Sequence, residues 1–431
     1  MTPAARLSAA IELLAAIETD PRRPADALAN DFFRQRRFIG GSDRRAVGER
    51  VWDVLRSRRR LAWWLARAAA PVTPRLLVAA ALVLQGWTLD GVAKSFSGGK
   101  FGPTALRAEE AAALRTLEGH SLDHPDMPEA VRLEVPDWLL PSLEARFGPA
   151  LAEELAALAE PAPLDLRANL LKATREQVQE SLAAEGVEAK PTPFSPWGLR
   201  VPGRRPVTAG RTFQQGLVEI QDEGSQLVAA LVGAAPEMRV VDWCAGAGGK
   251  TLAMAMTMQN RGHIAACDVS AARLDGAVRR LRRAGVHNVE RHVVEPGDKW
   301  AKRRAGGFDR VLVDAPCTGI GTWRRNPDAR LRLSARDLAE LQGKQAAILG
   351  QAARLVRSGG RLVYATCSLL TEENEAQVQS FLAAHPDFAV VPLARVWTLP
   401  GDPPCPGPFL MLTPRRHGTD GFFAAVLERV A

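Results

Sequence analysis

The chain has 431 residues, 46% of them hydrophobic and 24% charged, and its longest apolar run, Leu76 to Leu84, is far shorter than the ~20 residues of a membrane-spanning helix. Its five cysteines form no CxxC pair and have no histidine at metal-ligand spacing, which excludes a disulfide framework and a zinc site and predicts that no metal is bound. The formal net charge of +8 favours a polyanionic partner but says nothing about the fold.

Residues 1–155 show helical periodicity almost throughout, which predicts an all-α domain. Glu12 interrupts what would be the apolar region of a signal peptide, so we expect a cytoplasmic protein without membrane contact. The apolar repeats with three-to-four spacing cover Ala5–Ile17, Arg45–Leu65, Leu76–Leu89 and Leu139–Leu158.

The segment from Arg34 to Arg67 contains eleven arginines and three acidic residues, so its local net charge is 11 − 3 = +8. The guanidinium group suits phosphate, and phosphate contacts give affinity without sequence information. The cluster therefore indicates RNA or another polyanion. The alternative is an ordinary solvated helix face.

Residues 156–230 have the pattern of a small α+β module. Leu164–Leu171 is predicted to be a strand, and Thr174–Glu185 a helix that Thr174 and Gln177 cap. Arg167 and Lys172 are candidates for phosphate contacts in this module, although exposed charge is the commoner explanation.

Strands and helices alternate through residues 231–431, which predicts a doubly wound, mainly parallel sheet. Ligands of such sheets bind at the carboxyl ends of the strands. The predicted strands are Arg239–Cys244, His263–Asp268, Val289–Val294, Arg310–Asp314, Arg361–Thr366 and Phe422–Leu427, and the main helices are Ala271–Ala284, Asp337–Val356 and Glu372–Ala384.

A glycine-rich turn, Asp242–Thr251, follows the first strand of this sheet and opens a helix, as in nucleotide sites. Cys244 stands where a phosphate-binding P-loop needs glycine, and Thr251 stands where the dinucleotide fingerprint needs its third glycine. An adenosine-type cofactor without a pyrophosphate remains. Asp268, at the end of the second strand, is suited to bind ribose hydroxyls, although an aspartate there can also cap a helix.

Two thiols lie at the ends of two later strands, which run into Asp314-Ala-Pro-Cys317 and Thr366-Cys367-Ser368. If the strands are neighbours, both thiols end on the cofactor side of the sheet, about 4.8 Å apart at the backbone. This arrangement suits methylation of carbon-5 of a pyrimidine, in which a thiolate adds to carbon-6 and activates the ring. Asp314 could hold N3 of the base.

These motifs resemble the Sun-type bacterial ribosomal-RNA cytosine-5 methyltransferases of the RsmB/NOP family. Ser42–Leu61 is similar to the NusB-like helical domain of these enzymes, and Leu166–Thr174 and Val218–Ala229 are similar to their linker module. The segments similar to their catalytic domain are Trp243–Thr251, Asp314–Asp328, Ala365–Glu375 and His417–Phe423. The resemblance implies three domains, at 1–155, 156–230 and 231–431, the last a class I, Rossmann-like methyltransferase fold.

The resemblance implies S-adenosylmethionine as cofactor, with Cys367 as nucleophile and Cys317 as the thiol for product release. It also implies that an acid after the third strand touches the adenine, and ungapped counting favours Glu295 over Asp298. Trp323 could stack a base or form a wall of the fold. The implied cofactor contacts are Cys244, Ala245, Gly246, Ala247, Gly248, Gly249, Lys250, Asp268, Glu295 and Asp314, and the candidate RNA contacts are Arg44, Arg45, Arg167, Lys172, Arg324 and Arg325.

Small-subunit (16S) ribosomal RNA is the expected substrate and a monomer the expected state, and three alternatives stay open. One is a DNA cytosine methyltransferase, in which Cys317 would attack. The others are a transfer-RNA methyltransferase and an inactive RNA-binding assembly factor. The intact pair of thiols argues against the inactive factor.

Overall fold

The computed structural model describes residues 1–203 and 205–430, which form two compact units. One unit contains Met1–Ala159 together with Arg325–Ser334, and the other contains Glu160–Arg324 together with Ala335–Ala431. The first boundary lies within four residues of the predicted one. The predicted module 156–230 and the predicted catalytic domain share the second unit, and a ten-residue segment of the catalytic sequence joins the first.

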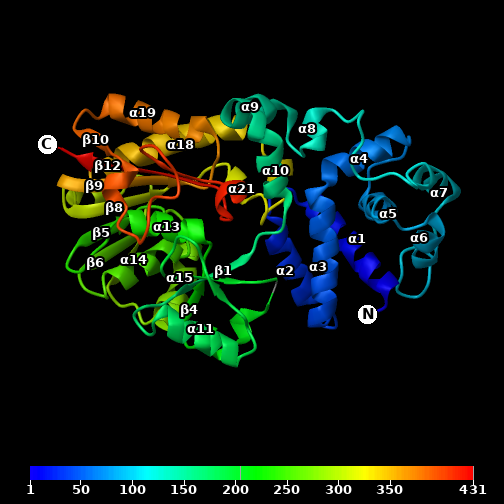
Figure 1. The fold of residues 1–431 in the computed structure, drawn as a ribbon, viewed down its shortest axis with the longest axis horizontal. Coiled ribbons are helices and arrows are strands. Elements are labelled where there is room, and N and C mark those ends of the chain that lie inside the picture. Colours follow the sequence, from blue (N-terminus) through cyan, green and yellow to red (C-terminus); the bar gives the residue numbers. More distant parts are fainter. Residues whose placement is uncertain (204, 431) are drawn as a thin grey trace. The chain divides into compact units, whose positions relative to one another are not determined.

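The helical unit is all-α, as its periodicity predicted (Figure 1). Two predicted helices are interrupted: Arg45–Leu65 breaks at Ser57, and Leu139–Leu158 breaks at Gly148, whose φ of +50° an L-residue rarely adopts. The helices are α1 (Pro3–Thr19), α2 (Ala25–Gln35), α3 (Gly41–Arg56), α4 (Arg58–Arg67), α5 (Pro74–Leu84), α6 (Leu89–Ser95), α7 (Ala108–Arg115), α8 (Glu129–Arg132), α9 (Leu140–Phe147), α10 (Leu151–Ala159) and α17 (Ala329–Arg332), with 3-10 turns η1 (Asp137–Leu139) and η2 (Gly148–Ala150).

The segment Arg325–Ser334 is held in the helical unit by hydrogen bonds to three helices or their ends. The Ala25 amide donates to Oδ2 of Asp328 at 3.1 Å, and Nε1 of Trp52 donates to the Arg325 carbonyl at 3.3 Å. Arg330 is buried and donates to the Glu134 carbonyl at 3.4 Å. A segment that follows the predicted catalytic Cys317 therefore belongs to a different unit from Cys317 itself.

The module in the second unit has a four-stranded antiparallel sheet in the order β2-β3-β1-β4. The predicted capping of its main helix is confirmed, because the Thr174 side chain accepts from the Gln177 amide and the Gln177 side chain accepts from the Thr174 amide. The elements are β1 (Leu164–Ala168), α11 (Arg175–Ala184), β2 (Lys190–Pro191), β3 (Gly198–Val201), η3 (Val207–Ala209), α12 (Arg211–Gln214), β4 (Val218–Ile220) and α13 (Glu223–Leu231).

The rest of the second unit is a Rossmann-like eight-stranded sheet, with strand order β10-β12-β9-β8-β5-β6-β7 and with β11 paired to β12. Its five strands from β9 to β7 are parallel, as predicted, whereas β10, β11 and β12 add antiparallel pairs. The strands are β5 (Arg239–Asp242), β6 (His263–Asp268), β7 (Val289–Val293), β8 (Phe308–Asp314), β9 (Val356–Thr366), β10 (Phe388–Val391), β11 (Leu410–Leu412) and β12 (Phe422–Arg429).

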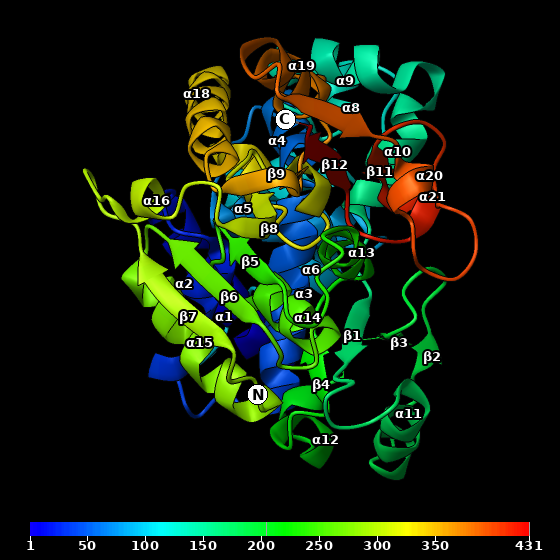
Figure 2. The ribbon, with the colours of Figure 1, turned by 90° about the vertical axis from the view of Figure 1, so that its left-hand side faces the viewer.

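Helices cover both faces of this sheet (Figures 1 and 2). Alternate residues of a strand point to opposite faces, so Val240 packs with α13 and α14 while Val241 packs with α18 and α19. The helices are α14 (Gly249–Thr257), α15 (Ala271–Ala284), α16 (Trp300–Arg303), α18 (Ala335–Ala353), α19 (Glu375–Ala384), α20 (Leu393–Val396) and α21 (Pro414–His417), with 3-10 turns η4 (Ile320–Thr322) and η5 (Thr371–Glu373).

Parallel strands end at the same edge of the sheet, so β5, β6, β8 and β9 bring their carboxyl ends together. Among the described residues, no helix is long and apolar enough to cross a membrane. The same part of the chain holds no group of three or more histidine, cysteine or acidic side chains placed to bind a metal.

Candidate active site

The glycine turn connects β5 to α14 and leaves open space beside its backbone. Gly248 has a φ of +78°, and a Cβ there would lie 3.2 Å from the Cβ of Ala277. Gly246 also has a positive φ of +55°, but a Cβ there would meet no atom within 4 Å. Glycine at both positions lets the turn pack on α15 on one side and receive a ligand closely on the other.

Asp268 supports this turn from the end of β6. Its Oδ2 accepts a hydrogen bond from the Gly246 amide at 2.8 Å, and its Oδ1 accepts one from the Ser270 amide at 2.8 Å. The alternative capping role is taken by Ser270, whose side chain accepts from the Arg273 amide at the start of α15. Each carboxylate oxygen of Asp268 keeps a further lone pair that ribose hydroxyls could use.

Asp242, at the end of β5, is a buried carboxyl with one unsatisfied oxygen. Its Oδ2 accepts from Oγ1 of Thr251 at 2.6 Å, whereas Oδ1 has no hydrogen-bond partner among the described residues. Burial, together with the charges of Asp314 and Asp268, raises the pKa of Asp242 to about 7. An unsatisfied buried oxygen next to the glycine turn indicates a site that a polar ligand completes.

This pKa predicts that the stability of the protein without cofactor falls as the pH rises. An unfolded aspartate has a pKa of about 3.9, so between about pH 4 and pH 7 only the folded state holds this proton. The free energy of unfolding should therefore fall by at most about 1.4 kcal/mol per pH unit in that window. Asp242→Asn, which stays neutral, should gain about 1–2 kcal/mol on the wild type between pH 5.5 and pH 7.5 in urea unfolding. An unchanged difference would contradict the raised pKa.

Lys250 connects the glycine turn to the end of β8. Its Nζ donates to Oδ2 of Asp314 at 2.6 Å and lies 5.4 Å from the ring centre of Phe422 on β12. Burial lowers the pKa of Lys250, but the charge and hydrogen bond of Asp314, with a contribution from Cys367, outweigh this effect and raise it. Lys250 is therefore a cation near both the acid and the second thiol.

The two predicted thiols face each other at the ends of β8 and β9, which are adjacent parallel strands as expected. The Sγ atoms of Cys317 and Cys367 are 3.4 Å apart, and both side chains are partly exposed. The hydrogen bond to Cys367, together with burial, raises the pKa of Cys317 well above that of an ordinary thiol. Cys317 is thus a neutral thiol at neutral pH.

A buried polar network that the sequence did not reveal fixes the two cysteine loops. Glu373 accepts from the amide of Thr318 at 2.9 Å and from its hydroxyl, and it also accepts from Nε2 of Gln345 at 2.9 Å. Asn374 donates to the carbonyl of Ser368 at 3.0 Å. The only sequence indication was the pair of polar residues six and seven positions after Cys367, in a segment that looks exposed.

Comparison with known proteins identifies the family. Residues 229–428 match the family model described as 16S rRNA methyltransferase RsmB/F, and residues 135–208 match a ferredoxin-like domain of RsmF/B-like methyltransferases. The probable ribosomal RNA small subunit methyltransferase B of Synechocystis is 37% identical over 315 residues, which is 72% of this chain and 70% of the relative. The chain belongs to the RsmB/F methyltransferase family. The enzyme of the same name from Thermus thermophilus is 35% identical over 71% of this chain and 68% of the relative.

Solved structures agree with this assignment. The crystal structure of a protein named PH0851 has a TM-score of 0.80 and 27% identity, and the match covers 99% of both chains. A methyltransferase homolog from Pyrococcus horikoshii has a TM-score of 0.61 and 28% identity over 71% of this chain and all of its own. RsmB/F methyltransferases use S-adenosylmethionine, which confirms the predicted cofactor.

Two of the arginines predicted to contact RNA have structural roles in this RsmB/F chain. Arg324 is 5% exposed, and its Nε donates to Oδ1 of Asp420 at 2.6 Å. Arg167 is 3% exposed and donates to Gln221 and to the Gly249 carbonyl. The expectation that these side chains face RNA is wrong, because both are buried and hydrogen-bonded inside the protein. Trp323 is 1% exposed, so it forms a wall of the fold.

The RsmB/F motif around Asp420 joins this buried cluster. The Asp420 amide donates to both oxygens of Asp222, which also accepts from the Gly224 amide at the start of α13. The backbone of Gly421 approaches Gly321 so closely that a Cβ on Gly321 would lie 2.3 Å from the Gly421 carbonyl oxygen. These motif residues hold the Cys317 loop against β12.

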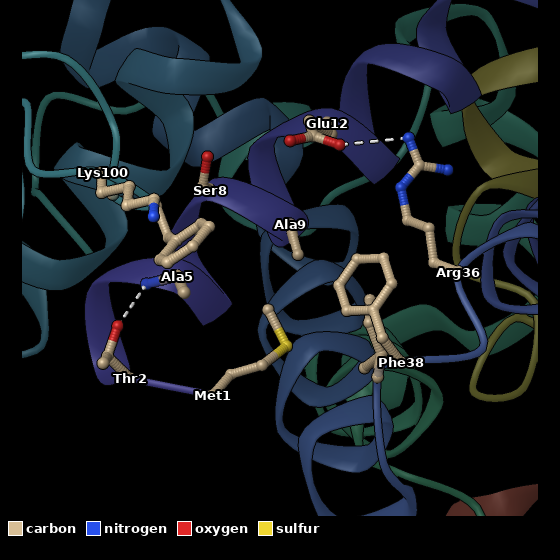
Figure 3. A pocket seen from close by; sticks show the side chains of 12 residues that line it. Met1, Thr2, Ala5, Ser8, Ala9, Glu12, Arg36, Phe38 and Lys100 are labelled. Carbon is tan, nitrogen blue, oxygen red and sulfur yellow. Dashed lines mark hydrogen bonds and ion pairs between the residues drawn. The ribbon is translucent and has the colours of Figure 1, made fainter.

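The arginine cluster of the helical unit is largely neutralised by acids from outside the Arg34–Arg67 window. Arg36, for example, pairs with Glu12 at 3.2 Å beside a hollow of about 570 Å³ (Figure 3). The arginines of the cluster with an ion pair are Arg34, Arg36, Arg56, Arg58, Arg59, Arg60 and Arg67. Because most arginines of the cluster are paired within the protein, the cluster offers little free positive charge to RNA. An RNA contact by the exposed Arg45 stays a prediction.

The remaining residues predicted to contact RNA or the adenine differ in how far the protein already binds their side chains. Lys172 donates to the Gln215 and Arg283 carbonyls at 2.7 and 2.6 Å, and Nε of Arg44 donates to the Ile39 carbonyl at 2.7 Å. Asp298 accepts from the Trp300 amide at 2.8 Å and pairs with His292 at 2.5 Å. Glu295 is exposed. The choice of Glu295 for the adenine contact stays a prediction, as does an RNA contact by Arg325.

Proposed function

We propose that this chain is an S-adenosylmethionine-dependent RNA cytosine-5 methyltransferase that acts on small-subunit ribosomal RNA through a covalent bond to Cys367. The observation that carries the proposal is the 3.4 Å separation of the Cys317 and Cys367 sulfurs beside the Lys250–Asp314 pair. A DNA cytosine methyltransferase, which would attack with one thiol, does not require this pair of thiols, and neither does a protein that only binds RNA. The substrate named for its relatives supports ribosomal RNA.

The turn Cys244–Lys250 and Asp268 are proposed to hold the cofactor. The open side of Gly246 admits the ligand backbone, and the lone pairs of Asp268 accept from ribose hydroxyls. Burial raises the pKa of Cys244, so that thiol serves as a neutral wall of the pocket. When bound, S-adenosylmethionine supplies an electrophilic methyl group on a sulfonium.

Cys367 is proposed as the nucleophile because its sulfur lies near the Lys250 cation, and reactive thiolates occur next to such charges. Its sulfur forms a bond to carbon-6 of cytosine as the carbon-5–carbon-6 double bond opens. The electron pair moves toward carbon-5 and N3, which would make carbon-5 nucleophilic toward the methyl group of the cofactor, whose carbon–sulfur bond would break as the new carbon–carbon bond forms. Asp314 accepts a hydrogen bond from Nζ of Lys250 at 2.6 Å, and a proton that Lys250 passes through this carboxylate to N3 would stabilise the charge that develops there.

Cys317 is proposed to act in the release step. The proton on carbon-5 must leave as the double bond re-forms and the bond from Cys367 to carbon-6 breaks. Cys317 begins as a neutral thiol because of its raised pKa, and it lies within hydrogen-bond reach of the departing Cys367 sulfur. The Cys317 thiol can donate its proton to the departing Cys367 sulfur, and the Cys317 thiolate left behind can accept the proton from carbon-5, so that both cysteines end as neutral thiols.

Methyl transfer from tritiated S-adenosylmethionine to unmodified 16S ribosomal RNA tests the proposal. We expect incorporation into 16S RNA, and bisulfite sequencing of total RNA from a deletion strain should show one newly unmodified cytosine in that RNA. Newly unmodified cytosines confined to transfer RNA would overturn the substrate assignment. Cofactor binding without any methyl transfer would overturn the enzymatic role.

A further inference from the structure

A hollow of about 540 Å³ lies where helix α15 meets α12 of the module (Figure 2 labels both helices). Its walls carry four guanidinium groups and one amide, and among the described residues no acidic or apolar side chain lines it. The lining residues are Gln214, Gly276, Arg279, Arg280, Arg282 and Arg283. None of these residues was among the sequence-predicted RNA contacts.

Two of the four arginines are held in place by the protein. Nη2 of Arg283 pairs with Glu219 of β4 at 2.7 Å, and its guanidinium lies 3.8 Å from the ring centre of Phe213. Nε of Arg280 lies 3.4 Å from Glu219, and Nη1 of Arg280 donates to the Ala247 carbonyl in the glycine turn at 2.6 Å. The single carboxylate of Glu219 thus pairs with two arginines, so the four arginines of the hollow keep a net positive charge.

The side chains of the other two arginines, Arg279 and Arg282, are exposed and make no hydrogen bond or ion pair with the residues that the structure describes. They are three positions apart on α15, so they share one helix face. Like charges at this spacing repel each other, and an anion between them would remove that penalty.

Stabilising the C-terminal end of α15 does not explain these arginines. Cations near a helix end often bind its last carbonyls. Here Nζ of Lys172 donates to the Arg283 carbonyl at 2.6 Å, and Nδ2 of Asn169 donates to the Ala284 carbonyl at 2.9 Å. Because residues of the module already bind the helix end, the side chains of Arg279 and Arg282 remain available to an external partner.

We propose that this hollow binds the phosphodiester backbone of the substrate RNA, at nucleotides outside the one that is methylated. Arginine forks match phosphate oxygens, whereas the lining offers no apolar side chain against which a nucleobase could pack. Arg280 extends from the hollow to the cofactor turn, so RNA bound here lies beside that turn. The inference rests on the proposed function, since it assigns that RNA a second contact surface.

Filter binding of radiolabelled, in vitro transcribed 16S RNA to the full chain tests the proposal. Arg279→Ala/Arg282→Ala should weaken binding about 10-fold near 0.15 M salt and lower the slope of log affinity against log salt by about 1.5, as expected for two lost phosphate contacts. Arg279→Lys/Arg282→Lys should recover most of the affinity because it keeps both charges. The turnover of both variants at saturating RNA should stay at the wild-type value.

Arg354→Ala/Arg395→Ala is the matched control, since it removes two exposed arginines elsewhere in the same unit. A melting temperature within about 2 °C of the wild type would show that each variant is folded. RNA affinity that is unchanged, or reduced only as much as in the control, overturns the proposal and leaves the hollow to an acidic protein partner. A wild type that binds RNA through these arginines but transfers no methyl group would overturn the proposed function alone.

Discussion

Cys317→Ala is expected to leave RNA covalently attached to the protein, whereas Cys367→Ala should give neither methylated product nor adduct. The difference follows from the two roles at one 3.4 Å contact: Cys367 forms the bond to carbon-6, and Cys317 assists its release. Methyl transfer by Cys367→Ala should fall by roughly 10⁴-fold or more, as for loss of other enzymatic nucleophiles. A denaturing gel with labelled RNA and a tritium-transfer assay measure the two effects.

Cys405→Ala is the control for this pair, because Cys405 is a partly exposed thiol that accepts a hydrogen bond from the Met411 amide at 3.3 Å. It should transfer methyl groups like the wild type and leave no adduct. If the adduct instead accumulates in Cys367→Ala and Cys317→Ala is inert, Cys317 is the nucleophile, as in the DNA-type mechanism.

Asp314→Asn should reduce turnover by roughly 10²–10³-fold, the usual cost of removing one group that stabilises developing charge. The amide keeps the size of the side chain but removes the carboxylate to which Lys250 donates at 2.6 Å. A proton from Lys250 can then no longer pass through that carboxylate to N3 of the base. Steady-state kinetics at saturating cofactor and RNA measure the loss.

Asp309→Asn provides a matched control for this substitution, because Asp309 lies on the same strand but at its opposite end. There it accepts from the Arg239 amide at 2.8 Å and pairs with Arg357 at 2.7 Å. Its turnover should stay close to that of the wild type. A decrease of less than about threefold in Asp314→Asn would remove Asp314 from the mechanism.

Much of the catalytic fold could be predicted because strand ends in a parallel sheet meet at one edge. The thiols of Cys317 and Cys367 follow the ends of two neighbouring strands, and helix α15 has the predicted bounds Ala271–Ala284. The hydrophobic periodicity of each segment and the position of its motif were sufficient to predict these features. The strands β10 and β11 were missed because they are only four and three residues long, and β10 pairs with β12, which begins at Phe422 and is distant in sequence from it.

The charge environment could not be predicted, since the partners of an arginine are chosen by tertiary packing. Arg324 looked like a surface residue beside Cys317, yet it pairs with Asp420, 96 positions away. Counting charges between Arg34 and Arg67 similarly omitted partners such as Glu12 and Asp137. Glu373 showed its role only when the fold placed it under the Thr318 amide.

The most direct test of the covalent mechanism uses 16S RNA transcribed with 5-fluorocytidine and incubated with the wild-type protein and S-adenosylmethionine. Fluorine at carbon-5 cannot leave as a proton does, so the bond between sulfur and carbon-6 should persist. Digestion and mass spectrometry should then find a methylated fluoropyrimidine on the peptide that contains Cys367. A modified peptide that contains Cys317, or no modified cysteine at all, would contradict the proposed mechanism.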